Sequence, residues 1–436
     1  MNGSIAQSAF SRVGQLASLP AVHSAFRWFH LQEAKIMQWQ HDLVSIAAPP
    51  FGEQARAAWL AEAFRKLGLA QVEIDMEGNV LGWLEPVSAG PRPCVLLSAH
   101  IDTVFPRDTP IHPVLDYRRL TAPGACDNGA GVAGMLAVAA ALKSCGFSSP
   151  VDIVFAGNVG EEGDGNLRGV RCLYEMSPWK DRICAHIVLD GGGADTAVTQ
   201  ALGSRRYLIT LRGPGGHSWT DAGTGNPIVV LSQAIASLAA LPVSPRSSLS
   251  VGTIEGGSSV NSIPERAAAR FDLRSLEAEE LIAMEVALHR AIEDAVLAAN
   301  RGRGESSRPG DIDFEIEQVG NRPAGMLPPG SPLFETLFMV DRHLGIRTQE
   351  RTASTDANLP LSLCIPAVTI GAGGEGGGVH TRGEWYDATG RELALRRILL
   401  LVLAMAWNAA PEPSFETFGG YDRQGRERNM ARNDLY

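Results

Sequence analysis

The sequence lacks several features that would mark other classes of protein. No run approaches the eighteen or so apolar residues expected of a membrane span, and the first thirty residues lack the basic start and apolar stretch of a secretory signal. The net charge of −10 and a pI near 5.5 argue against nucleic acid or an anionic membrane as the main partner, because both favour basic surfaces. None of the six cysteines forms a C-x-x-C pair, which predicts reduced thiols in a cytoplasmic protein.

Nucleotide-binding signatures are also missing. The glycine-rich stretch G-A-G-G-E-G-G-G precedes His380, but no Lys-Ser or Lys-Thr follows it, and no G-x-G-x-x-G opens a helix after a strand. The glycines are explained at least as well by a backbone that approaches a neighbouring site closely.

Short apolar runs separated by helical stretches indicate an α/β fold. Apolar spacing is helical over 36–69, and small residues predict a helix over 129–143. The unalternated runs indicate parallel strands buried on both faces. They occupy 94–99, 151–156, 187–189 and 367–370.

The pattern changes between residues 204 and 320, where the order of predicted elements is β-α-β-β-α-β. The predicted strands cover 207–211, 249–254, 266–273 and 312–318, and the helices cover 227–241 and 277–299. We therefore predict a catalytic domain with a mixed, mostly parallel sheet flanked by helices, formed by 1–203 and 321–436. An inserted lid or dimerisation domain spans 204–320, and the polar stretch from Pro411 is expected to end in a poorly packed tail.

Five metal-type ligands lie at strand ends or in glycine-rich turns. Two imidazoles and three carboxylates suit a pair of divalent ions that share one carboxylate, with Zn²⁺ the first expectation and Co²⁺ or Mn²⁺ alternatives. Ligands in open α/β sheets gather beyond the carboxyl ends of the strands, as these residues do. They are His100, Asp127, Glu162, Asp190 and His380.

Each of these signals has a simpler structural explanation when taken alone. A His-x-Asp pair such as His100 and Asp102 is common by chance, although Asp102 at a strand end could orient the imidazole. Similarly, Glu161 and Glu162 could form a solvated acidic turn. They follow the apolar run V-D-I-V-F-A directly, however, so that one carboxylate could bind metal while its neighbour acts as a base.

Taken together, the motifs resemble one metallopeptidase family, over nearly the whole chain except the first thirty and last twenty-five residues. This family contains tripeptide aminopeptidase (peptidase T), bacterial glutamate carboxypeptidase, aminoacylase, acetylornithine deacetylase and succinyl-diaminopimelate desuccinylase. The motifs that carry the resemblance, in the family's order, are S-A-H-I-D-T-V, G-A-C-D-N-G-A-G, G-E-E-G, L-D-G-G, G-G-H-S, V-N-S-I-P and G-V-H.

The resemblance implies a role for each metal-centre residue. His100 and Asp190 would bind one ion and Glu162 and His380 the other. Asp127 would bridge both ions, with a cis peptide bond to the following asparagine. The remaining two roles would fall to Glu161 as general base and to Asp102 as the partner of His100.

In the inserted domain, the resemblance implies that His217 and Asn261 contact the substrate and transition state. In dimeric members the histidine crosses to the neighbouring subunit. Arg274 would bind a substrate carboxylate, and Arg322 is a weaker candidate for the same task.

The resemblance predicts a two-metal hydrolase that cleaves amide bonds in short peptides. The aspartate of L-D-G-G and the stretch H-S-W-T-D-A-G-T-G-N-P favour the peptidase T-like members. A deacylase or desuccinylase acting on N-acyl amino acids is the first alternative, and an inactive metal-binding protein is the second. We expect a homodimer formed through the inserted domain, with no nucleic-acid or membrane partner.

Overall fold

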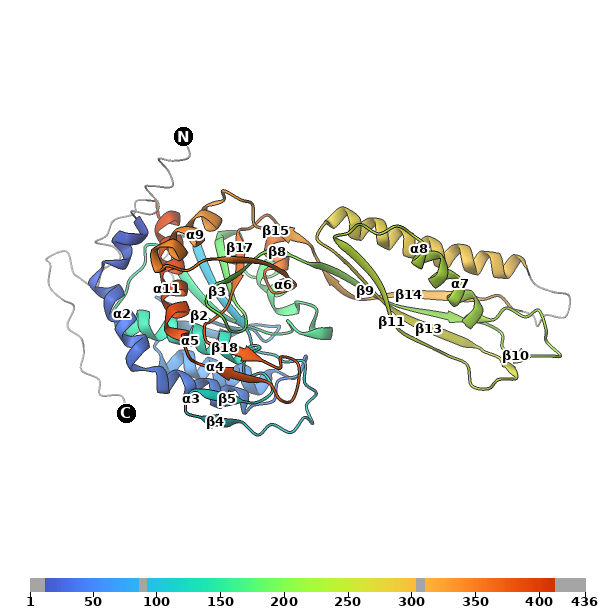
Figure 1. The fold of residues 1–436 in the computed structure, drawn as a ribbon, viewed down its shortest axis with the longest axis horizontal. Helices are drawn as coiled ribbons and strands as arrows, with labels where there is room; N and C mark the ends of the chain where they lie inside the picture. Colours follow the sequence, from blue (N-terminus) through green and yellow to red (C-terminus); the bar gives the residue numbers. More distant parts are fainter. Residues whose placement is uncertain (1–11, 86–91, 303–309, 412–436) are drawn as a thin grey trace. The chain divides into compact units, whose positions relative to one another are not determined.

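The computed structural model describes residues 12–85, 92–302 and 310–411 (Figure 1). The chain forms two compact units. One combines Met1–Gln200 with Met326–Tyr436, and the other is Ala201–Gly325. The tail expected beyond Pro411 and the loop around 303–309 lie outside the described residues.

The larger unit contains a nine-stranded mixed sheet whose centre is parallel. Strands β6, β3, β7 and β17 are parallel neighbours, and they contain the four apolar runs that predicted buried strands. All residues of β3 and β6 are buried, which explains why these runs do not alternate with polar residues. In spatial order the sheet contains β1 (Ala70–Ile74), β2 (Val80–Trp83), β6 (Asp152–Asn158), β3 (Cys94–His100), β7 (Ile183–Leu189), β17 (Ala367–Ile370), β8 (Thr196–Ala201) and β15 (Gly325–Met326), and β16 (Gln349–Ala353) pairs with β8.

Helices cover both faces of this sheet. On one face α5 (Gly129–Ser144) and α11 (Arg391–Ala409) pack on the central strands, and α2 (Pro20–Leu31) and α3 (Glu33–Val44) pack on α5. On the other face α6 (Arg168–Glu175) and α10 (Asn358–Ser362) share a core with strand residues such as Leu96 and Val154. The mixed, mostly parallel sheet flanked by helices is therefore confirmed.

The helical stretch predicted over 36–69 is divided into two helices. These are α3 and α4 (Gln54–Lys66), and Pro49 and Pro50 lie between them. Because proline lacks the backbone N–H that a helix interior requires, a helix cannot continue through this segment, although the apolar spacing of the sequence does.

A small sheet beside the main one holds the His380 turn. It has the order β18 (Glu375–Gly377), β19 (Trp385–Asp387), β5 (Arg119–Thr121) and β4 (Val114–Asp116). The turn between β18 and β19 carries His380, and β5 leads into the segment that carries Asp127. Because β19 pairs with β5, these two segments lie side by side although they are far apart in the sequence.

The inserted unit has the predicted β-α-β-β-α-β order. Its antiparallel sheet has the order β11 (Ser247–Gly256), β13 (Arg266–Ser275), β9 (Gly203–Arg212) and β14 (Asp313–Arg322). Helices α7 (Pro227–Ala239) and α8 (Ala278–Arg301) contribute Leu231 and Leu288 to a core with Phe271 and other strand residues. A two-stranded ribbon pairs β10 (Gly216–His217) with β12 (Ser262–Ile263).

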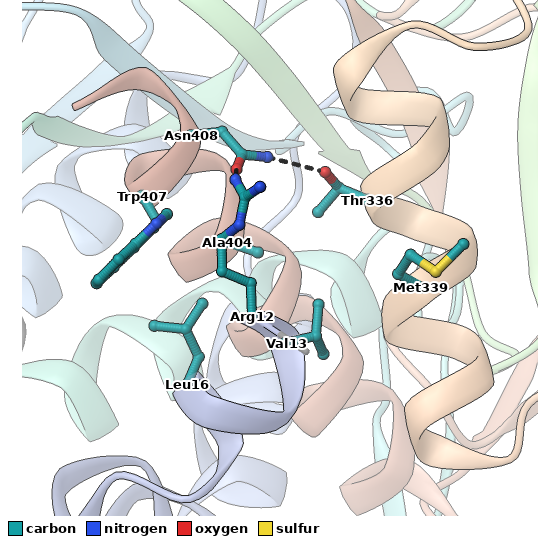
Figure 2. A pocket seen from close by; sticks show the side chains of 8 residues that line it. All are labelled: Arg12, Val13, Leu16, Thr336, Met339, Ala404, Trp407 and Asn408. Atoms are coloured by element: carbon teal, nitrogen blue, oxygen red, sulfur yellow. Dashed lines mark hydrogen bonds between the residues drawn. The ribbon is translucent and has the colours of Figure 1, made fainter. Parts of the chain in front are cut away.

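The N-terminal segment packs onto the larger unit. Residues 12–17 are helical, and Arg12 donates a hydrogen bond to Asn408 Oδ1 at 2.8 Å, while Asn408 donates to Thr336 Oγ1 at 3.0 Å (Figure 2). The crevice between them has a volume of about 10 Å³, no more than one water molecule needs. The crevice lies between the N-terminal segment, α9 (Pro332–Leu344) and α11, and it is too small for a substrate.

Within the described residues, no helix combines the length and the apolar character needed to cross a bilayer.

Candidate metal centre

The five expected ligand residues come from five separate segments of the larger unit. His100 ends β3, Glu162 follows β6 and Asp190 directly follows β7. Because these strands are parallel neighbours, their carboxyl ends meet at one edge of the sheet. Asp127 precedes α5, and His380 lies in the β18–β19 turn, where its backbone φ is 64°.

The carboxylate of Asp127 lies between the two histidines. His100 Nε2 is 3.0 Å from Asp127 Oδ1, and His380 Nε2 is 3.0 Å from Asp127 Oδ2. Each oxygen of one carboxylate therefore faces a different imidazole, the geometry expected of a ligand shared by two cations.

The other two carboxylates complete a donor set on either side. His380 Nε2 is 2.9 Å from Glu162 Oε1, and His100 Nε2 is 3.7 Å from Asp190 Oδ1. His100, Asp127 and Glu162 each offer a ligand atom within 4.8 Å of the others. Imidazole nitrogens and carboxylate oxygens arranged in this way suit borderline divalent ions, so the residues present fit a metal pair.

Asp102 connects three parts of the centre and is fully buried. Its Oδ1 is 3.5 Å from His100 Nδ1, the ring nitrogen that points away from Asp127. The same carboxylate accepts hydrogen bonds from the backbone N–H groups of Glu161, at 3.1 Å, and Glu162, at 2.8 Å. It therefore fixes the backbone of the acidic pair and lies beside the His100 imidazole.

The close packing of these groups shifts their pKa values. Burial would raise the pKa of Asp127, but the two imidazoles outweigh it and hold the pKa well below its ordinary value. The hydrogen bond to Asp127 raises the pKa of His380 to about 9. Burial, reinforced by the charge of Asp127, raises the pKa of Glu162 to about 7. A divalent ion would have to displace the protons that these groups hold.

Side-chain hydrogen bonds fix the segment around Asp127. The Asp127–Asn128 peptide bond is cis, as the resemblance implied. Asn128 Oδ1 accepts from Gly131 N at 3.0 Å, which caps α5, and from Gly191 N at 3.2 Å, while Asn128 Nδ2 donates to Leu189 O at 2.8 Å. The Asn128 side chain thus ties the Asp127 turn to the turn that carries Asp190.

Sequence reasoning missed two buried carboxylates near the centre. Glu384 accepts hydrogen bonds from three backbone N–H groups of the Asp127 segment. Asp356 accepts from Asn158 Nδ2 at 2.8 Å, and burial raises its pKa to about 6. The available signals were a glutamate four residues after His380 and an aspartate in the polar run S-T-D-A-N. Neither has a periodicity that marks it.

The structure brings His217 and Asn261 together within the inserted unit. Ser218 N donates to Asn261 O at 3.0 Å, and β10 pairs with β12 beside them. His217 Nδ1 accepts from Trp219 N at 3.1 Å. This bond places the ring proton of a neutral His217 on Nε2, where it is available to a ligand.

The two candidate arginines of the inserted unit occupy one row of its sheet. Arg274 on β13 and Arg322 on β14 both pair in register with Ser204 of the central strand. Arg274 Nε donates to Asp272 Oδ2 at 2.7 Å, and about a third of the Arg274 side chain is exposed, whereas Arg322 is buried.

The fold and the five converging side chains define a class of proteins, those with a mixed α/β sheet domain that carries a candidate centre for a pair of metal ions. The model described as Peptidase family M20/M25/M40 matches residues 96–405, and the chain belongs to that family. This confirms the predicted family and identifies the protein as a hydrolase of the peptidase type.

Individual relatives share a low sequence identity with this chain. The chain is 25% identical over 316 residues to a probable carboxypeptidase of Aspergillus clavatus, a match that covers 66% of this chain and 69% of the relative. A tripeptidase structure from Staphylococcus aureus has a TM-score of 0.69 at 20% identity, covering 86% of this chain and 98% of the other. The Bacillus subtilis YXEP structure, described as a dinuclear metal-binding peptidase, has a TM-score of 0.62 at 16% identity, covering 85% and 97%.

Proposed function

We propose that this protein is a zinc-dependent hydrolase of amide bonds in short peptides, acting as a dipeptidase, tripeptidase or aminopeptidase. The observation that carries the proposal is the position of Asp127, whose two carboxylate oxygens each face a different histidine at 3.0 Å. The similarity to a tripeptidase and a probable carboxypeptidase supports a peptide substrate.

In this proposal His100, Asp127, Glu162, Asp190 and His380 would hold the two ions. Such ions, when bound, polarise the scissile carbonyl and make water a stronger nucleophile. The protein would contribute the rest of the chemistry through its own residues, with Asp102 keeping the His100 ring in the orientation that its 3.5 Å contact supports.

Glu161 would act as the general base. Its residue is 5% exposed, and its backbone N–H is held by Asp102, which supports a fixed position beside Glu162. Glu161 would take a proton from the attacking water and deliver it to the leaving amine. Transfers of this kind contribute about 10²–10⁴-fold to the rate.

His217 would donate from Nε2 to the oxyanion of the transition state, in the tautomer that the bond from Trp219 N supports. We further propose a cytoplasmic homodimer, formed through the inserted unit, in which His217 acts in the partner's site. The exposure of Trp219, Ile254 and Val260 on the inserted unit supports an interface there.

The test combines a substrate screen with two matched variants. Wild type is assayed on di- and tripeptides and on N-acetyl and N-succinyl amino acids, where a clear preference for the acylated amino acids would favour the deacylase alternative. Glu161→Gln should lower kcat by about 10²–10⁴-fold while two ions remain bound. Glu162→Gln makes the same chemical change at the neighbouring position and should instead reduce metal content. Normal turnover in Glu161→Gln, or loss of metal from it, would show that the two glutamates are assigned the wrong way round.

A further inference from the structure

Glu384 is a fully buried carboxylate that the proposed reaction does not use. It is four residues after His380 and directly precedes β19. Its Oε2 accepts from Gly124 N at 2.9 Å, and its Oε1 accepts from Cys126 N and Asp127 N, both at 2.8 Å. A carboxylate can accept several such bonds at once, and bonds to a charged acceptor are stronger than neutral ones.

The backbone of Glu384 holds the same segment. Its carbonyl oxygen accepts from Ala122 N at 3.0 Å, and the next residue, Trp385, pairs in register with Thr121. Four hydrogen bonds therefore connect the end of the His380 turn to residues 122–127. One of them goes directly to the backbone N–H of Asp127.

The receiving segment is shaped for this close approach. Gly124 has a φ of 75°, and a Cβ atom at this position would lie 2.8 Å from Thr103 Cγ2. A side chain at 124 would therefore be strained and crowded. The glycine allows the chain to turn its N–H groups towards the Glu384 carboxylate.

We propose that Glu384 is a positioning residue of the metal centre. Its carboxylate sets the orientation of Asp127 and couples that residue to His380, so that two ligands on segments more than 250 residues apart keep their separation. This inference rests on the proposed metal centre and adds to it a group that does not itself bind the ions.

A glutamine at 384 tests the role of the carboxylate with little change in shape. An amide offers one acceptor oxygen and one NH₂ donor, so it cannot receive all three N–H groups. Either Gly124 N or the pair Cys126 N and Asp127 N would face another donor. The Asp127 segment would then have to shift, and the two ions would lose the geometry of their shared ligand.

The experiment measures binding of Co²⁺ to metal-free protein by its visible absorption, without substrate. For Glu384→Gln we expect the affinity to fall by about 10–100-fold, the usual effect of losing a group that orients a ligand. The matched control is Glu375→Gln, which removes the same charge from an exposed position on β18. It should bind Co²⁺ as wild type does. Urea unfolding of the metal-free proteins is measured in parallel.

A purely structural Glu384 would lower the unfolding midpoint of the metal-free protein and leave the Co²⁺ affinity and spectrum of the folded protein unchanged. Folded Glu384→Gln that binds Co²⁺ within twofold of wild type overturns the inference. If Glu384→Gln does not fold, Glu384→Asp, which withdraws the carboxylate by one methylene, is judged by the same criterion. Wild type that binds no pair of Co²⁺ ions would instead reject the proposed metal centre itself.

Discussion

Replacing Asp102 by asparagine should weaken the metal centre without altering any proposed ligand. The carboxylate accepts two backbone N–H groups on separate oxygens and lies 3.5 Å from His100 Nδ1. Burial alone would raise the pKa of Asp102, but the histidine and the two N–H groups outweigh it and hold the pKa below its ordinary value. The fold therefore stabilises the charged form, and a neutral amide loses that stabilisation.

The magnitude follows from the hydrogen bonds that are lost. Asparagine has one acceptor oxygen, so one of the two backbone donors, from Glu161 or Glu162, would be left buried opposite an NH₂ group. Hydrogen bonds to charged groups contribute about 1.5–3 kcal/mol, and we expect the free energy of unfolding to fall by a similar amount. Losing the partner of His100 should also weaken metal binding by about 10–100-fold, or roughly 1.4–2.7 kcal/mol.

Two measurements separate these effects. Zinc affinity is measured by competition with a chelator, and unfolding is followed by tryptophan fluorescence, because only Trp219 of the eight tryptophans lies in the inserted unit. The control is Asp75→Asn, since Asp75 also accepts backbone N–H groups, at 2.9 Å, in the turn between β1 and β2. It should retain zinc affinity. The reasoning would be refuted by an Asp102→Asn protein with wild-type zinc affinity and an unchanged unfolding midpoint.

Three further predictions concern substrate, assembly and pH. Arg274→Lys should lower kcat/KM strongly for peptides with a free α-carboxylate and much less for their amides, because lysine cannot form the two parallel hydrogen bonds that a guanidinium donates to a carboxylate. Equal losses on both substrates would remove that assignment. Glu161→Ala and His217→Ala proteins, each inactive alone, should regain about a quarter of wild-type sites after random subunit exchange if the histidine crosses the dimer. No recovery after verified exchange would reject the crossing. Apparent Co²⁺ affinity should rise between pH 6 and about 9, with release of protons, because the ion displaces protons from Glu162, with a pKa of about 7, and His380, with a pKa of about 9. An affinity independent of pH over this range would contradict the shifts.

Local sequence patterns predicted the elements whose burial is uniform. The run that forms β3 does not alternate with polar residues because helices cover both faces of the strand, and the small residues of α5 mark a helix buried on all sides. Pro49 and Pro50 in the sequence indicate a break in the helix, but the apolar spacing continues past them, and a single helical stretch was therefore predicted. Burial of the N-terminal residues could not be inferred from the family motifs, because none of those motifs includes them.

The candidate site was predictable where ligand chemistry stands in a family motif, beside a recognisable strand end or in a glycine-rich turn. His100 and Asp190 satisfy that condition. Glu384 does not, because its role depends on N–H groups 257–260 residues earlier in the chain. No local periodicity in the sequence indicates a hydrogen bond between residues so far apart along the chain. The pairing of β19 with β5 brings the two segments together.

The division of the larger unit into two chain segments has a consequence for its biosynthesis. Strand β17 pairs with β7 in the sheet but begins at Ala367, whereas β7 ends at Leu189. At about 5–20 residues per second, translation of the intervening chain takes roughly 10–35 s. During that time β7 presents an unpaired edge to solvent or to a chaperone, while Ala201–Gly325 is contiguous and can fold as it emerges. Because the proposed ligand His380 belongs to the second segment, the complete set of candidate ligands can come together only after that residue has left the ribosome.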